Sequence, residues 1–286
     1  PDWPPLRLQY RDYAAWQRTL LGDTPDRTSG PLRRQYAYWR EQLAGVPAAM
    51  PLPLDRARPP VRTGDGGSVP VTFTPRLHRA VLDLARTRRT TTFITVHAAL
   101  VALLAQRGAG DDVVVAAAVS DRGDGALEEL VGFFVKTLVL RVDASGHPGF
   151  DELLERVHET DQKAFTHQDV PFEHVVDLVN PPRSLAMHPL AQVMLAFQVD
   201  DADPSAMVGL VSAAEPVEMG IAKFDLCLKV VEHLDAIGRP NGMSGVLEYA
   251  TDVIDEATAC SLVTGLEAVL ERATVAAGPP VTGRKD

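Results

Sequence analysis

Cysteine is scarce in this sequence of 286 residues, since Cys227 and Cys260 are the only two. They lack metal-ligand spacing, so they form no cysteine-based metal site, and we expect both thiols to be reduced in a cytoplasmic protein. Long apolar runs are also missing, because no stretch reaches the roughly 18 apolar residues of a membrane span. The first residues have no basic region followed by an apolar one, which argues against a signal peptide. The start at Pro1 suits a segment of a longer chain.

Basic residues are fewer than acidic ones, 28 against 38, and the formal net charge of −10 makes nucleic acid a poor partner. The motifs G-x-S-x-G, H-E-x-x-H and G-x-x-x-x-G-K-[ST] do not occur. Gly64-Asp65-Gly66-Gly67 is dense in glycine, but its proline-rich surroundings favour a flexible loop over a phosphate-binding one. The 8 histidines are scattered, and Pro171 interrupts the helical spacing of His167 and His174, so we expect no metal site.

Apolar residues make up 45% of the chain, enough for a sizeable core in one large domain or two small ones. Alternating and continuous apolar patterns predict about six strands, which alternate in many places with about six helices. The predicted strands cover 68–73, 113–119, 133–142, 191–199, 224–233 and 245–250. Residues 201–222 are predicted to be irregular. This pattern favours an α/β fold in which helices pack against a mixed sheet.

A sharp corner between two helices is predicted at His167-Gln168-Asp169-Val170-Pro171-Phe172-Glu173. Pro171 suits the first turn of the second helix, and Asp169 is placed to cap that helix. Taken locally, this pattern gives the side chains at the corner only capping and turning roles.

An aromatic repeat and a lone histidine indicate packing, whereas a polar turn after a strand indicates a place for a site. Tyr36, Trp39 and Leu43 repeat at helical spacing, which is typical of a buried helix face. His97 lies within a long apolar helix and is expected to be a core residue. The polar turn 120–125 follows a strand that is predicted to be buried on both faces, and such turns are common sites in layered α/β folds.

Four blocks of sequence share a likeness to one family. They are Tyr10-Arg11-Asp12-Tyr13-Ala14-Ala15-Trp16-Gln17, Val131-Gly132-Phe133-Phe134-Val135-Lys136-Thr137-Leu138-Val139-Leu140-Arg141, the corner at 167–173, and Arg183-Ser184-Leu185-Ala186-Met187-His188-Pro189-Leu190. In this order they resemble the later core motifs of nonribosomal peptide synthetase condensation domains: Y-x-D-[FY]-A-x-W-Q, [IV]-G-x-F-V-N-T, [HN]-Q-D-x-P-F-E and R-x-x-S-R-[NH]-P-L. The resemblance covers nearly the whole chain. The family's earlier H-H-x-x-x-D-G motif, which carries its active-site histidine, does not occur among these residues.

The resemblance implies a chloramphenicol-acetyltransferase-like α/β fold and the C-terminal lobe of a two-lobed enzyme. Such an enzyme is an acyltransferase that joins a donor acyl or peptidyl thioester to the amine of an acceptor aminoacyl thioester, forming an amide. Both substrates are tethered to the phosphopantetheine arms of peptidyl carrier proteins, and no cofactor is bound. The implied partners are the missing N-terminal lobe, the carrier proteins and adjacent synthetase domains. We expect this chain alone to be inactive.

The resemblance also implies where the substrate tunnel between the lobes lies. The residues implied near the tunnel are Gly132, Phe134, Val135, Lys136 and Thr137. Gly132 would allow close backbone approach. Lys136 stands where the family usually has Asn, so it either contributes a cation near the tunnel or extends into solvent at the end of the sheet.

The remaining motif residues are expected to be architectural. Tyr10, Asp12, Trp16 and Gln17 match the motif at the crossover between lobes and are expected to pack or cap. The corner residues are His167, Gln168, Asp169, Pro171, Phe172 and Glu173. Arg183 begins the last block, and an ion pair with Asp169 or Glu173 is one expectation for it. Met187 replaces the family's second arginine, so contacts made by that side chain are absent.

This interpretation divides the chain into crossover helices (1–45), a proline- and glycine-rich connector (46–67), the C-terminal lobe (68–277) and a tail (278–286). The alternative function is a non-catalytic condensation-like domain that docks partner proteins. The sequence leaves both functions open, because the histidine motif that separates them lies outside these residues. Residues 132–137 argue against an epimerisation or heterocyclisation domain.

Overall fold

The computed structural model describes residues 5–21, 30, 32–200, 219–235 and 237–276. Their helices and strands follow one another in the order α1 (Tyr10–Leu21), α2 (Arg33–Gln42), β1 (Gly66–Phe73), α3 (Pro75–Thr87), α4 (Thr92–Gln106), β2 (Asp112–Ser120), a short 3₁₀ turn (Gly125–Leu127), β3 (Val135–Asp143), α5 (Phe150–Thr166), α6 (Phe172–Val179), β4 (Val193–Asp200), β5 (Leu226–Leu234), β6 (Pro240–Ala250) and α7 (Glu256–Ala276). The irregular segment predicted at 201–222 lies mostly outside the described residues, as does the tail.

The strands form one 6-stranded sheet in the order β1-β6-β5-β4-β2-β3. The neighbours of β4 on both sides, β2 and β5, run parallel to it, whereas the other pairs are antiparallel. The predicted mixed sheet is therefore confirmed. At the edge of the sheet, β1 pairs with β6, and at the opposite edge β3 pairs only with β2.

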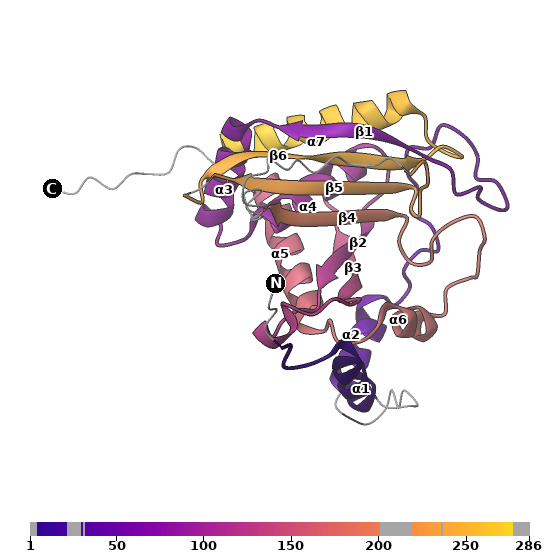
Figure 1. Cartoon of the computed structure of the whole chain (residues 1–286). Helices are drawn as coiled ribbons and strands as arrows, with labels where there is room; N and C mark the ends of the chain where they lie inside the picture. Colours follow the sequence, from indigo (N-terminus) through magenta and orange to yellow (C-terminus); the bar gives the residue numbers. More distant parts are fainter. Residues whose placement is uncertain (1–4, 22–29, 31, 201–218, 236, 277–286) are drawn as a thin grey trace.

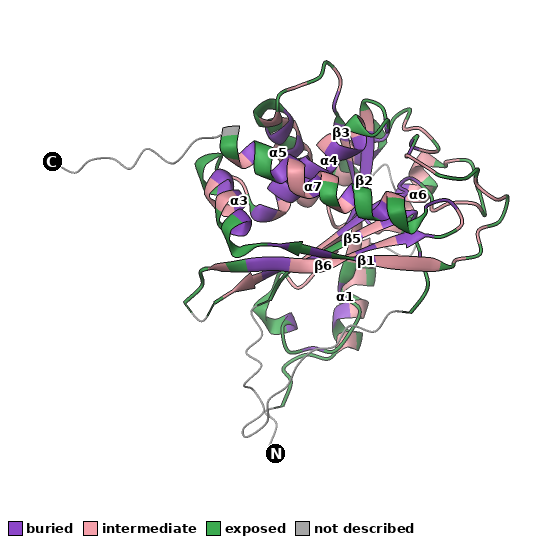
Figure 2. Ribbon diagram, turned by 90° about the horizontal axis from the view of Figure 1, so that it is seen from above, coloured by how far each residue is buried: buried purple, intermediate pink, exposed green. Residues whose placement is uncertain are grey.

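Helices α3, α4, α5 and α7 lie together on one face of the sheet, as the view from above shows (Figure 2). Two of these helices have side-chain N-caps. The hydroxyls of Thr74 and Thr91 accept hydrogen bonds from the backbone N–H groups of Leu77 and Ile94, which caps α3 and α4. α4 is buried nearly all round, and β2 is buried on both faces along its first half. The largest apolar core therefore lies between the sheet and these helices.

A second apolar cluster forms around the end of the sheet that carries β3. There α2 and α6 lie close together below β2 and β3 (Figure 1). Tyr36, Trp39 and Leu43 are buried in this cluster with Leu138 and Val175. The aromatic repeat in α2 is thus confirmed as packing.

The buried histidine in α4 is also confirmed as a core residue. His97 has no exposed surface, and its Nδ1 lies 2.9 Å from Oδ2 of the equally buried Asp161 on α5. Pairing a buried histidine with a carboxylate offsets part of the cost of removing both from water. The sequence pattern did not identify Asp161 as its partner.

Several local predictions were wrong. β1 begins at Gly66, inside the glycine-dense stretch that was predicted to be a flexible loop, and β6 begins at Pro240 rather than at 245. Trp16 was expected to pack, but 59% of it is exposed, because only Tyr13 of α1 is buried. β3 begins at Val135 rather than at 133, since Ser120 at the end of β2 pairs with Val135 and the residues before Val135 have no partner strand. Asp169 does not cap α6: the N-cap residue is Pro171, without a side-chain hydrogen bond.

Candidate functional site

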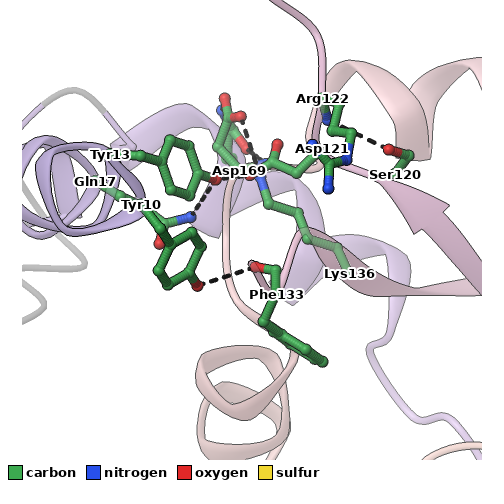
Figure 3. A network of polar contacts seen from close by, with 10 residues as sticks. Tyr10, Tyr13, Gln17, Ser120, Asp121, Arg122, Phe133, Lys136 and Asp169 are labelled. Atoms are coloured by element: carbon green, nitrogen blue, oxygen red, sulfur yellow. Dashed lines mark hydrogen bonds and ion pairs between the residues drawn. The ribbon is translucent and has the colours of Figure 1, made fainter. Parts of the chain in front are cut away.

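Lys136 lies at the centre of a polar junction between α1, the end of β2, the start of β3 and the corner between α5 and α6. Its Nζ is 2.6 Å from Oδ1 of Asp121 and 3.8 Å from Oδ1 of Asp169. Figure 3 shows the side chains of Tyr13, Lys136 and Asp169 converging near Asp121. The Lys136 side chain is only 14% exposed. The expectation that it extends into solvent was therefore wrong. We call Tyr13, Asp121, Lys136 and Asp169 the junction.

Helix α1 reaches the junction through Tyr13. The phenol of Tyr13 donates a hydrogen bond to Oδ2 of Asp121, and Nε2 of Gln17 donates to the phenol oxygen at 3.1 Å. Burial raises the pKa of Tyr13 well above its usual value, and the hydrogen bond to Asp121 and its negative charge add to this effect. Tyr13 therefore acts as a neutral donor that ties α1 to the end of β2.

Asp169 is held from the side of α2. Its Oδ2 accepts from Nε2 of Gln35 at 2.6 Å, and its backbone N–H donates to Oε1 of Gln35 at 3.0 Å. The neighbouring His167 ends α5, with its ring stacked on Tyr38 at a centroid distance of 4.1 Å. Its carbonyl accepts from Nε1 of Trp39 at 2.9 Å. The corner is thus fixed to α2 on two sides.

The segment before β3 contacts α1 at close range. The hydroxyl of Tyr10 donates to the carbonyl of Phe133 at 3.0 Å, and the Tyr10 ring packs edge-on against Phe134 at 5.3 Å. A Cβ atom at Gly132 would overlap the ring of Tyr10. The absence of a side chain at Gly132 therefore allows the Tyr10 ring to approach the backbone closely. The guanidinium of Arg122 lies 4.2 Å from the ring centroid of Phe134, in cation–π range.

Exposed apolar side chains surround this segment. Val131 is 93% exposed, Phe133 is 76% exposed and Val135 is 53% exposed. The ring of Phe133 points away from Tyr10 (Figure 3). Of the residues implied near the tunnel, Phe134 is buried, whereas Lys136 and Thr137 are half-buried on β3. The exposed residues of this block are thus 131–133 and Val135, whereas Phe134 and Lys136 turn inward.

The last block lies apart from the junction. Arg183 and Met187 line a pocket of about 380 Å³ together with Asp177, Asn180 and His188. Burial lowers the pKa of His188, whose ring stacks between Phe172 and Phe224. Within the described part of the chain, the ion pairs do not include Arg183, and the partners of Asp169 are Gln35 and Lys136. The expected pairing of Arg183 with Asp169 or Glu173 was therefore wrong.

The other motif residues take local roles. Oδ2 of Asp12 accepts the backbone N–H of Gln9 at 2.9 Å, which is the reciprocal half of a capping box at the start of α1. Phe172 and Glu173 begin α6, where a carboxylate is favoured by the helix dipole. Gln168 is half-buried at the corner.

The junction can orient groups but has little means of moving protons. Its one lysine and two carboxylates leave a formal charge of −1, and Lys136 forms an ion pair with Asp121.

Among the described residues, no group of three or more His, Cys, Asp or Glu side chains could hold a metal ion. In the same residues, no helix is long and apolar enough for a membrane span. The sequence patterns did not identify Asp121 and Tyr13 as members of the junction, or Gln35 as the partner of Asp169, although the turn containing Asp121 was predicted as a place for a site.

A family model described as "Condensation domain" matches residues 2–281. The chain is 46% identical over 273 residues to a protein of Salinispora arenicola described as "Probable non-canonical nonribosomal peptide synthetase (NRPS) CymA", and 43% identical over 273 residues to a dimodular nonribosomal peptide synthase of Bacillus subtilis. Each match covers 96% of this chain, but only 4% and 11% of those proteins. The chain thus spans a small part of the length of the relatives it matches.

Among solved structures, the X-domain in complex with OxyB from teicoplanin biosynthesis is 33% identical, with a TM-score of 0.86. That match covers 97% of this chain and 60% of the X-domain chain. A four-domain nonribosomal peptide synthetase bound to AMP and glycine matches with a TM-score of 0.80 at 23% identity, which concerns the fold alone. The predicted chloramphenicol-acetyltransferase-like α/β fold is confirmed.

Proposed function

Because this chain belongs to the condensation-domain family, we propose that it is the C-terminal lobe of a condensation domain in a nonribosomal peptide synthetase. In the complete domain, the amine of an acceptor aminoacyl thioester attacks the carbonyl carbon of a donor thioester. The amine loses a proton, the carbon–sulfur bond breaks, and the donor thiol leaves as the amide forms. Holding two tethered substrates end to end supplies much of the rate in such a reaction.

One observation carries this proposal: three of the four family blocks meet in the junction. Tyr13, Lys136 and Asp169 come from blocks that are far apart in the sequence, and Asp121 joins them. An arrangement that depends on contacts between blocks explains why those blocks occur together. We propose that residues 132–137 form part of one wall of the substrate tunnel, with Phe133 and Val135 turned toward the tunnel or the missing lobe.

The proposed partners follow from the reaction. They are the N-terminal lobe that carries the H-H-x-x-x-D-G histidine, peptidyl carrier proteins with phosphopantetheine arms, and adjacent synthetase domains. The division of the chain at 45, 67 and 277 belongs to the same proposal. Exposed apolar side chains such as Val131 and Phe133 fit a surface that another lobe covers.

The decisive test uses the parent polypeptide. Its N-terminal sequence and intact mass show whether an H-H-x-x-x-D-G motif precedes Pro1, and we expect that it does. Incubated with a donor acyl carrier and an acceptor aminoacyl carrier, the parent should transfer the acyl group to the acceptor, which intact-protein mass spectrometry detects. The chain 1–286 alone should give no product. A parent variant with the second motif histidine changed to Ala is the control for uncatalysed transfer.

Two outcomes would overturn parts of this proposal. Product formed by the chain 1–286 alone would refute its dependence on a second lobe. Absence of product with a parent polypeptide that lacks the histidine motif would refute the catalytic function itself.

The second candidate function is a docking module without catalysis. The observation that favours it is the similarity to the X-domain, which is solved in complex with OxyB. A parent without the motif histidine, which binds a partner enzyme in sedimentation and forms no amide, would support this function over the first.

Lys136 is the residue to vary within the complete domain, since the family usually has Asn there. We propose that Lys136 positions the wall of the tunnel through Asp121 and does not transfer protons. Lys136→Asn should then raise KM for the acceptor carrier more than it lowers kcat. A large fall in kcat that equals the fall in kcat/KM, with KM unchanged, would contradict a positioning role.

A further inference from the structure

The face of the sheet opposite α3, α4, α5 and α7 carries a second polar group of side chains. These are Asp200 on β4, His233 on β5 and Ser244 on β6, three neighbouring strands. Helices cover the other face, where Leu228 and Met243 are buried (Figure 2). We call Asp200, His233 and Ser244 the open-face group. It is separate from the junction, which lies at the end of β2 and the start of β3.

The distances within this group match those of an activated nucleophile. Nδ1 of His233 lies 3.2 Å from Oδ2 of Asp200, and Nε2 lies 2.6 Å from Oγ of Ser244. Because an ionised carboxylate only accepts hydrogen bonds, we assign the hydrogen of a neutral His233 ring to Nδ1. The lone pair of Nε2 then faces the hydroxyl of Ser244. Nucleophile, base and a third group that orients the base are the diagnostic features of covalent catalysis.

Strand register and a bulge bring the three side chains together. Asp200 pairs directly with His233, and Ser244 pairs with Val231, so all three side chains point to the same face. The pairing of β5 with β6 shifts between Glu232 and Leu234, at the position of His233. Opposite this irregularity, Gly242 has a φ of +99°, which a side chain would strain. Bulges re-aim side chains and occur often beside active sites.

The group is open to reagents. The side chains of His233 and Asp200 are 32% and 44% exposed, and Ser244 is half-buried. In this it differs from the buried pair of His97 and Asp161, which no reagent can reach. An imidazole with a carboxylate and a serine on a reachable surface can act on molecules from solution.

We propose that Ser244 is a nucleophile that accepts acyl groups from esters and thioesters. Oγ of Ser244 attacks the acyl carbonyl carbon while Nε2 of His233 takes its proton. The bond to the leaving alcohol or thiol then breaks, and the imidazolium returns the proton to that group. The product is an acyl-serine ester, and attack by water with the same base releases a carboxylic acid and restores Ser244.

Release of the acyl group should be slow. β6 lies between β1 and β5, so ladder hydrogen bonds take up backbone N–H groups near Ser244 that could otherwise stabilise an oxyanion. Accumulated acyl-serine, rather than rapid turnover, is therefore the expected readout. This inference does not depend on the proposed amide-forming function, and either can fail without the other.

The test uses p-nitrophenyl acetate as the acyl donor and the intact chain as the protein. Peptide mapping by mass spectrometry should find an acetyl ester on Ser244 that hydroxylamine removes. Ser261 on α7 is exposed, its Oγ accepts from Nη2 of Arg107 at 3.0 Å, and it serves as the internal control in the same sample. We expect Ser244 to be acetylated about 100-fold faster than Ser261, since a positioned general base contributes about 10²–10⁴-fold and a guanidinium is no base.

Variants assign the role of each residue. Ser244→Ala should lose the hydroxylamine-sensitive adduct, whereas Ser261→Ala should keep it. His233→Gln should slow acetylation about 100-fold, and Asp200→Asn should slow it less, because it removes only the group that orients the ring. Equal acetylation of Ser244 and Ser261 in the unmodified chain, or an unchanged rate in His233→Gln, would overturn the proposal. Because the acetylation rates of the two serines are compared within the unmodified chain, this comparison tests the proposal even where a variant fails to fold.

Discussion

The body of the sheet and the junction are stabilised by different kinds of contact. The body packs α3, α4, α5 and α7 against the sheet through a large set of buried apolar side chains. In the described part of the chain, the apolar cluster beside the junction comprises four buried residues, Tyr13, Leu127, Leu130 and Phe134, and the junction itself is formed by ion pairs and hydrogen bonds. The body should therefore unfold cooperatively, whereas α1 can separate from the sheet at a smaller free-energy cost.

The largest expected effect is in the body. Leu104 on α4 is fully buried, and Leu104→Ala should lower the free energy of unfolding by about 2–5 kcal/mol through lost burial and a cavity. Urea denaturation measures this change. Leu185→Ala, at a side chain that is 71% exposed, is the control and should stay within about 0.5 kcal/mol. Hydrogen exchange of α1 that rises as much as that of α4 in Leu104→Ala would mean that the two regions are not separate.

The next effect is at the centre of the junction. Lys136→Met leaves the mostly buried Asp121 without its cation, which should cost about 1–3 kcal/mol. Because the loss is local, hydrogen exchange should speed up in α1 and little elsewhere. Lys163→Met is the matched control, since Lys163 forms an exposed pair with Glu159 worth about 0–1 kcal/mol. Equal exchange in the two variants would show that the ion pair does not hold α1.

A smaller effect, with a distinct pH dependence, is expected at Tyr13. Tyr13→Phe removes one hydrogen bond to Asp121 and should cost about 1 kcal/mol at neutral pH. The folded state raises the pKa of Tyr13 through burial and Asp121, so it favours the neutral phenol. This stabilisation is full below the usual pKa near 10 and is lost as the pH rises past it.

The original chain should therefore lose its advantage over Tyr13→Phe above that pH. Burial also raises the pKa of Tyr38, but both proteins keep Tyr38, so the difference between them reports Tyr13 alone. A stability difference that stays constant through alkaline pH in denaturation curves would contradict this assignment.

The smallest effect is expected at the edge of the junction. Gly132→Ala should displace the ring of Tyr10 and weaken its hydrogen bond to Phe133, at a cost of about 0.5–1.5 kcal/mol. Gly123→Ala is the control, because a Cβ there meets no atom within 4 Å. If tyrosine fluorescence and thermal melts do not distinguish the two variants, the ring of Tyr10 can move away from residue 132 without cost.

Much of the fold could be predicted from local patterns because burial sets them. Val69, Val71 and Phe73 alternate as a half-buried strand should, and the continuous run 113–119 is the strand buried on both faces. The start of β3 could not be found in this way. Gly132 to Phe134 is as apolar as the strand that follows, and only the end of β2 at Ser120 shows where pairing stops.

The site was less predictable, since its contacts join residues that are distant in sequence. Asp169 has the right spacing for a helix cap, but Gln35 and Lys136 take its carboxylate instead. The partner of Lys136, Asp121, lies on a different element, and no local pattern pairs them. The sequence did identify the four family blocks, and three of them contribute residues to the junction.

The pairing of β1 with β6 has a consequence for synthesis on the ribosome. Gly66 pairs with Ala250 and Phe73 with Met243, so β1 cannot pair until β6 has been synthesised, more than 160 residues later. Contacts of such long sequence separation form late and slow folding. An unpaired apolar strand is prone to aggregation in the meantime. A chain truncated before β6 should therefore aggregate unless a chaperone binds it, because β6, the last strand of the described residues, completes the sheet.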